Sequence, residues 1–280
     1  MTDLPAWSEP FADASRSALL RATRVGGIDR DWAWGGATGA GITVAILDSG
    51  LELDHPALHG RVVESVAVEL DADGEPRVVP DTAGDLFGHG TACGGIILSL
   101  APEVELVSVR VLGADLRGKG VAFAAGLEWA IERGAQVANL SLSSKSEALY
   151  GTFHAIADEA YFRNVALVSA ANNVPGPSYP SLFSSVFSVA AHGEPDPWRI
   201  YYNPSPPVEW GAWGVDVPIA WKDGGSTVAT GNSFAAPHLA GIVALVLSKH
   251  PGLTPFEVKS VLAAVADNPR GDEAPPAGAP

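Results

Sequence analysis

The feature that most constrains the fold is an alternation that begins at Gly41, where short apolar runs rich in β-branched residues take turns with longer helical patterns. Because parallel strands cannot be joined by a tight turn, this alternation is typical of a parallel sheet with helical crossovers. We therefore expect an α/β fold with a mostly parallel central sheet that is flanked by helices on both faces. The predicted strands are Ile42–Leu47, Val62–Val68, Leu106–Val111, Val137–Leu142, Val165–Ala170 and Val186–Ala190, and the predicted helices are His89–Leu100, Gly120–Gly134, Ala148–Arg163, Ser233–Lys249 and Thr254–Val265.

The chain has 280 residues, a length that a single α/β domain commonly reaches. With 47% hydrophobic and 18% charged residues it can bury a large core, which excludes intrinsic disorder for most of its length. We expect residues 1–40 to form an N-terminal leader packed on the domain and residues 41–267 to form the domain itself. Residues 268–280 are expected to be a disordered tail because the segment is rich in proline, glycine and alanine.

The charge balance bears on partners and location. A net charge of −15 repels polyanions, so nucleic acid is not expected as a partner. No stretch approaches the roughly 20 apolar residues of a membrane-spanning helix, and the first residues lack the basic flank and apolar run of a secretory signal. The single cysteine, Cys93, cannot form an internal disulfide, which fits a reducing compartment. We expect a cytoplasmic protein without a membrane partner, although a trimmed export form would look similar; the oligomeric state is not indicated.

Three polar residues stand where chemistry is expected in such a fold, since ligands gather beyond the carboxyl ends of parallel strands. Asp48 directly follows an apolar strand, His89 lies between two glycines at a predicted helix start, and Ser233 opens a helix that is almost entirely apolar. Each residue alone has an ordinary structural interpretation: a carboxylate that caps a turn, a hydrogen-bonded histidine and an N-cap serine.

Taken together, Asp48, His89 and Ser233 supply the parts of a nucleophilic catalyst. A serine hydroxyl is too weak an acid to ionise at neutral pH, so it needs an imidazole as base and a carboxylate to orient that imidazole. The helix after Ser233 is expected to be central, so its positive end points into the interior or a cleft. At that end it could stabilise an oxyanion.

The order of these residues and the motifs around them resemble the subtilisin-like serine peptidases. The motifs are Ala45–Gly50, His89–Thr91 and Gly231–Gly241. Further blocks follow in the family's order, between roughly residue 28 and residue 265: Asp54–Leu58, Val109–Leu112, Gly126–Ile131, Asn139–Leu142, Tyr179-Pro180 and Val186–Ala190. The resemblance implies a subtilisin-like fold and a serine endopeptidase without a cofactor. In it Ser233 attacks the peptide carbonyl, His89 moves protons and Asp48 orients His89.

The resemblance also implies an oxyanion donor and a substrate site. It assigns the donor to Asn173 and puts Asn172 where the family usually has glycine, so the register at this strand end stays open. The extended substrate is expected along Gly118 and Gly120 and along Ser141, Leu142 and Ser143. The primary pocket is expected to be walled by Ala170, Ala171, Asn172 and Ser178. No acidic residue falls in these stretches, so we expect a hydrophobic side chain before the cleaved bond.

Two departures from the family pattern concern metals and thiols. Cys93 lies one helical turn after His89 and on the same face, where it is either a small buried residue or a thiol that affects catalysis. The loop that binds calcium in many family members is missing after the predicted helix 89–100. Asp71 and Asp73 could attract a hard cation, but a full site needs more ligands, so we expect a solvated hairpin whose turn has positive backbone angles at Asp73 and Gly74. No metal site is expected.

Two other classes of function are weighed against a protease of protein or peptide substrates. A catalytically silent peptide-binding module on the same scaffold would keep the cleft without the chemistry. A nucleotide-binding doubly wound protein would share the alternation of strands and helices. The nucleotide hypothesis fails because the glycine-rich segment 35–41 precedes a strand, whereas a phosphate-binding loop follows one.

Overall fold

The computed structural model describes residues 27–174, 176–205 and 207–268. Most of the predicted leader and nearly all of the predicted tail therefore lie outside the described residues. Within the leader, helix α1 (Arg30–Trp34) is N-capped by Asp29, whose side chain accepts a hydrogen bond from the Trp32 backbone. This short helix contacts helices α5 (Asn232–Lys249) and α6 (Pro255–Val265), so the described part of the leader packs on the domain.

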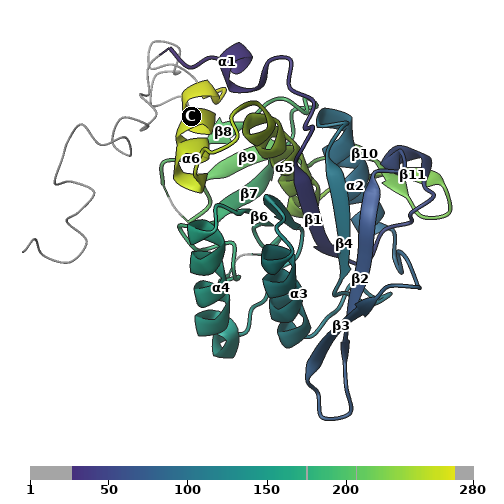
Figure 1. Ribbon diagram of the computed structural model, residues 1–280. Helices are drawn as coiled ribbons and strands as arrows, with labels where there is room; N and C mark the ends of the chain where they lie inside the picture. Colours follow the sequence, from purple (N-terminus) through teal and green to yellow (C-terminus); the bar gives the residue numbers. More distant parts are fainter. Residues whose placement is uncertain (1–26, 175, 206, 269–280) are drawn as a thin grey trace, which may run out of the picture.

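The centre of the described fold is a nine-stranded sheet in the order β3-β2-β4-β1-β5-β6-β7-β9-β8 (Figure 1). The pairs from β2 through β9 are parallel, and the edge strands β3 and β8 are antiparallel to their neighbours. The predicted mostly parallel sheet is therefore confirmed. Its strands are β1 (Thr43–Asp48), β2 (Val62–Leu70), β3 (Pro76–Pro80), β4 (Glu105–Arg110), β5 (Val137–Leu140), β6 (Ala166–Ala170), β7 (Phe187–His192), β8 (Tyr201–Tyr202) and β9 (Trp210–Trp213).

Helices cover both faces of the sheet, as the alternation predicts (Figure 1). Val44 and Ile46 of β1 belong to the core that contains α2 (His89–Leu100), α5 and α6. Their neighbours Ala45 and Leu47 belong to the core with α3 (Gly120–Glu132) and α4 (Tyr150–Phe162). Successive strand side chains point to opposite faces, so an unbroken apolar run such as β1 requires a helix layer on each side.

Helix α5 is the most deeply placed helix of the described fold. Every residue from Phe234 to Leu247 is buried, and the helix contacts β5, β6, β7 and β9. A helix that is apolar all round is stable only when it is enclosed, which explains its central position. Among the described residues no helix meets the length and apolarity that a membrane span requires. The N-terminus of α5 lies at the carboxyl ends of β6 and β7, where the Asn232 side chain is hydrogen-bonded to the backbone of Ala171 and Ala191.

The predicted elements agree with the observed ones to within a few residues, but several strands had no signal in the sequence. The short strands β8 and β9 lack an apolar β-branched run, and β9 reads Trp-Gly-Ala-Trp. A separate hairpin, β10 (Val217–Trp221) and β11 (Gly225–Ala229), packs beside α2. The predicted turn after β2 exists, but only Gly74 has a positive φ there, so the expectation for Asp73 is wrong. The loop has five residues, 71–75. In a loop of this length Asp73 does not need the left-handed conformation that a two-residue turn would require.

Candidate active site

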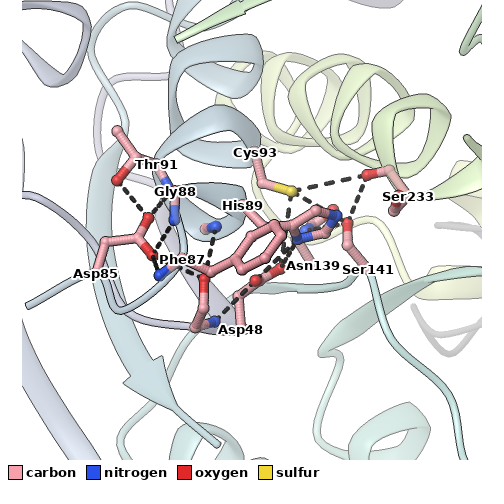
Figure 2. A network of polar contacts seen from close by, with 12 residues as sticks. Asp48, Asp85, Phe87, Gly88, His89, Thr91, Cys93, Asn139, Ser141 and Ser233 are labelled. Carbon is pink, nitrogen blue, oxygen red and sulfur yellow. Dashed lines mark hydrogen bonds and ion pairs between the residues drawn. The ribbon is translucent and has the colours of Figure 1, made fainter. Parts of the chain in front are cut away.

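Asp48 and His89 are brought together by the end of β1 and the start of α2. The Asp48 carboxylate is completely buried, and its two oxygens lie 2.9 and 2.8 Å from Nδ1 of His89 (Figure 2). The approach requires glycine at position 90, because a Cβ there would lie 2.1 Å from the Gly50 carbonyl oxygen. With Nδ1–H donating to Asp48, Nε2 is left as the acceptor of a proton from the cavity side.

The pKa of His89 follows from this pairing. Burial of the imidazole disfavours its charged form, but the adjacent Asp48 carboxylate more than compensates and raises the pKa of His89 well above its usual range. The Cys93 thiol lies beneath the pair, 3.8 Å from Asp48 Oδ2 and 3.3 Å from Ser141 Oγ. Burial raises the pKa of Cys93, so the thiol stays protonated. Cys93 is fully buried, as the first of the two interpretations expects.

Asp85 holds the loop that carries His89, and the sequence analysis missed it. Its Oδ1 accepts hydrogen bonds from Ser49 Oγ at 2.8 Å and from the backbone N–H groups of Phe87 and Gly88 at 3.0 and 2.7 Å. Its Oδ2 accepts from the backbone and hydroxyl of Thr91 at 2.8 and 2.6 Å (Figure 2). One carboxylate therefore ties the turn after Asp48 to the start of α2. The available signal was an Asp four residues before a helix start, where a capping carboxylate is favoured.

Ser233 is the second residue of α5 and faces the same cavity as His89. Its backbone carbonyl accepts hydrogen bonds from Ser141 Oγ at 2.8 Å and from the Cys93 thiol at 3.7 Å. Among the hydrogen bonds of the described residues none joins Ser233 Oγ to His89; such contacts commonly tighten only when substrate is bound. The first turn of an α-helix leaves backbone N–H groups without intrahelical partners. In α5 the N–H of Asn232 donates to Asn173 Oδ1 and that of Phe234 to the Gly231 carbonyl.

The two neighbouring asparagines at the end of β6 have different orientations. Asn173 Oδ1 accepts a hydrogen bond from the Asn232 backbone at 2.9 Å, which turns Nδ2 the other way. A Cβ on Gly231 would lie 3.2 Å from Ser233 Oγ and 3.7 Å from Asn173 Nδ2, so these two atoms border one small space. Asn172 instead folds back, and its Oδ1 accepts from the Val174 backbone at 3.1 Å. The geometry favours Asn173 as the donor.

Asn232 is a second positioning residue that sequence reasoning missed. Its Oδ1 accepts from the Ala191 backbone at 2.8 Å, and its Nδ2 donates to the carbonyls of Ala171 and Asn172 at 3.0 and 3.3 Å. The side chain thus joins the first residue of α5 to the ends of β6 and β7. Asn173 and Ser233 are held at a fixed spacing because both are anchored through Asn232.

The active-site cavity has a volume of about 500 Å³ and contains most of the predicted substrate residues. His89, Asn173 and Ser233 line it. Ser178 is the exception: its side chain is buried and bonded to Ser181 Oγ at 2.7 Å, so it offers no surface to a substrate. The predicted residues that do line the cavity are Gly118, Gly120, Ser141, Leu142, Ser143, Ala170, Ala171 and Asn172.

The one cluster of candidate cation ligands among the described residues and the Asp71 carboxylate are both engaged in hydrogen bonds. Asp48, His89 and Cys93 form a group whose ligand atoms lie within 4.8 Å of one another. A cation bound there would compete with the Asp48–His89 hydrogen bonds. The Asp71 carboxylate accepts from two backbone N–H groups of its own turn and from Arg77 at 3.0 Å, and the backbone N–H of Glu75 contributes most to lowering the pKa of Asp71. These contacts satisfy the hydrogen-bonding capacity of the Asp71 carboxylate without a cation.

Comparison with known proteins points to one family. The sequence matches the model of the subtilase family over residues 39–277. Subtilisin BL from Lederbergia lenta is 35% identical over 240 residues, covering 81% of this chain and 84% of that protein. Subtilisin DY from Bacillus licheniformis is 31% identical over 248 residues, covering 83% and 86%. The crystal structure of a cold-adapted subtilisin-like serine proteinase superposes with a TM-score of 0.66 at 28% identity, covering 83% and 86% of the two chains.

Proposed function

This chain belongs to the subtilase family and is a serine endopeptidase, and from that premise we propose that Ser233 is its nucleophile, His89 its general base and Asp48 the group that orients His89. The observation that carries the proposal is the double contact of His89 Nδ1 with the buried Asp48 carboxylate, next to a serine on the same cavity. That contact fixes the tautomer in which Nε2 can accept a proton.

In this mechanism each proton has a defined carrier. Ser233 Oγ attacks the peptide carbonyl while its proton passes to His89 Nε2. The negative charge that forms on the carbonyl oxygen is stabilised by Asn173 Nδ2 and by the backbone N–H of Ser233 at the start of α5. The His89 imidazolium then gives its proton to the leaving amine, and a water activated by His89 releases the acyl group from Ser233.

We further propose a hydrophobic side chain at the residue before the cleaved bond. Ala170 and Ala171 line the cavity beside the oxyanion donor, with the neutral side chains of Leu142 and Ser143 also on the cavity wall. The described residues that line the cavity include no carboxylate, so a basic side chain would lose hydration without gaining an ion pair.

The residue roles are tested by covalent labelling. A fluorophosphonate probe should modify Ser233, and Ser233→Ala should abolish labelling and lower kcat by at least about a thousandfold while the protein stays folded. A peptide library then reports the side chain preferred before the cleaved bond. Labelling at another serine, or a Ser233→Ala variant that keeps more than about a tenth of kcat, would refute the assignment.

We also propose a cytoplasmic location, which rests on Cys93 being the single cysteine of the chain. In a reducing compartment a single thiol stays reduced and needs no disulfide partner. Fractionation of the source cells followed by detection with an antibody is the direct test. Recovery of the protein from the culture medium would overturn this proposal and would leave the endopeptidase assignment unaffected.

A further inference from the structure

Two positively charged side chains line the cavity. They are Arg117 and Lys119, from residues 115–119 of the connection between β4 and α3, a segment that we call the cation rim. The chain as a whole has a net charge of −15, so two adjacent cations at a cavity are a local departure from its acidic surface. Neither residue takes part in the chemistry proposed above.

The backbone of the cation rim is held in a defined turn. The N–H of Gly113 donates to the carbonyl of Arg117 at 2.8 Å, and the N–H of Leu116 donates to the carbonyl of Gly113 at 3.0 Å. Leu116 adopts a left-handed conformation with φ of 56°, which a leucine occupies only when its surroundings impose it. Arg117 and Lys119 therefore extend from a hydrogen-bonded turn of defined backbone conformation.

The charges of the cation rim are available to a ligand. The nearest carboxylate to Arg117 is Asp115, at 3.9 Å, with 87% and 67% of the two side chains exposed. That separation is beyond hydrogen-bond range and the pair is open to water, so it neutralises Arg117 only weakly. Lys119 takes part in no ion pair among the described residues.

We propose that the cation rim selects peptide substrates that carry a carboxylate on the acyl side of the cleaved bond, beyond the residue in the primary pocket. The inference rests on the proposed function. The part of the substrate expected to run along Gly118 and Gly120 is the extended segment before the cleaved bond, and these glycines flank Lys119. An aspartate or glutamate in that segment meets Arg117 or Lys119, whereas a basic residue there is repelled.

The size of the effect follows from exposure. An ion pair open to water changes an affinity by about two- to fivefold, and salt screens it over a length of about 10 Å at 0.1 M. Selection by the cation rim is therefore expected as a moderate preference in kcat/KM that weakens as the salt concentration rises. It does not require any change in the chemical step at Ser233.

The experiment uses three peptide series that share one hydrophobic residue before the cleaved bond and carry Glu, Gln or Lys at the second, third or fourth position before it. We expect kcat/KM for Glu to exceed that for Gln by about two- to fivefold at one position, with Lys below Gln. The double variant Arg117→Gln, Lys119→Gln should bring the Glu/Gln ratio to one. Arg163→Gln, which removes one exposed charge at the end of α4 away from the cavity, should leave the ratio unchanged.

The outcomes separate this inference from the proposed function. A Glu/Gln ratio of one at every position, or a ratio that survives the double variant, overturns the role of the cation rim while continued hydrolysis of the Gln peptides supports the peptidase. If no peptide is cleaved and Ser233 resists the fluorophosphonate probe, the proposed function fails instead. Equal melting temperatures of the variants and the parent protein exclude loss of folding as the cause.

Discussion

At the catalytic site Asp48 and His89 are buried and joined by two close contacts, whereas at the cation rim Arg117 and Lys119 are exposed and extend into water. His89 is 7% exposed and bonds both oxygens of Asp48. Arg117 is 87% exposed in its side chain and has a single distant partner. The protein thus combines a buried, hydrogen-bonded catalytic pair, which we call the fixed end, with exposed cations on the cavity wall.

The difference teaches how the two tasks of a peptidase can be separated. Stabilising a transition state requires dipoles and charges that are already in place before the reaction, which burial and multiple hydrogen bonds provide. Discriminating among substrates requires only differences of a few-fold, which exposed charges supply without disturbing the fold. Substitutions at the catalytic end should therefore change kcat by orders of magnitude, and those at the cation rim should change only the ranking of substrates.

The sharpest test of the fixed end is the pair Asn173→Ala and Asn172→Ala. Asn173→Ala removes the Nδ2 that borders Ser233 Oγ and should lower kcat by about 100- to 1,000-fold with little change in KM. Asn172→Ala removes a side chain that bonds its own turn and should cost far less. Steady-state kinetics on one peptide compares them, and the reverse order of effects would mean that the wrong asparagine has been assigned.

Asp85→Asn tests whether the hydrogen bonds that hold the His89 loop contribute to catalysis. The new amide would place N–H groups against the N–H and hydroxyl of Thr91, which now donate to Asp85 Oδ2. Displacing the His89 loop by a fraction of an ångström should lower kcat by about ten- to a hundredfold while KM changes little.

Two measurements separate positioning by Asp85 from a purely structural role. The rate of fluorophosphonate labelling at Ser233 should fall together with kcat, and Ser49→Ala, which removes one of the five donors, should give a smaller loss of the same kind. A variant that melts earlier but keeps its labelling rate and kcat at temperatures where it is folded would show that Asp85 serves stability alone.

The pH dependence of activity should report the Asp48–His89 pair. Because the pKa of His89 is raised, activity should fall about tenfold per pH unit as the pH drops through that pKa, at a higher pH than an ordinary histidine would give. Asp48→Asn should move the acid limb to lower pH in whatever activity remains. An acid limb in the ordinary histidine range would contradict the raised pKa of His89, and activity that stays flat well below that range would show that another group transfers the proton.

Folding stability has the opposite dependence at this pair, so it must be measured alongside activity. A raised folded-state pKa means that protonated His89 stabilises the fold at low pH and that this contribution is lost as the pH rises through the folded pKa. His238 acts in the other direction, since burial lowers its pKa to about 4 and the fold loses stability as the pH falls from the ordinary histidine value toward 4. Circular dichroism at each pH distinguishes titration of His89 from unfolding.

The sequence points to the proposed catalytic residues more clearly than to the residues that position them. Asp48, His89 and Ser233 could be proposed from the sequence because each stands at the end of a strongly patterned strand or helix. Asp85 and Asn232 could not, since their partners come from segments far apart in the chain and depend on how the elements pack. The resemblance to the family placed Ser178 at the pocket, but its hydroxyl bonds Ser181 instead.

The smallest expected effect is that of calcium on thermal stability. Its measurement tests whether the protein is stabilised by its own hydrogen bonds without a bound ion. Helix α2 ends at Leu100 and β4 begins at Glu105, so the four residues between them cannot wrap six or more oxygen ligands around an ion at about 2.4 Å. A calcium ion present at a hundred times its Kd would stabilise the fold by about 2.7 kcal/mol, or about 5–10 °C in Tm for a domain of this size. Thermal unfolding with excess calcium and with chelator, at physiological ionic strength, should differ by much less than that. A saturable, calcium-specific rise of that size would show that an ion contributes after all, and Asp71→Asn would then be the first variant to locate it.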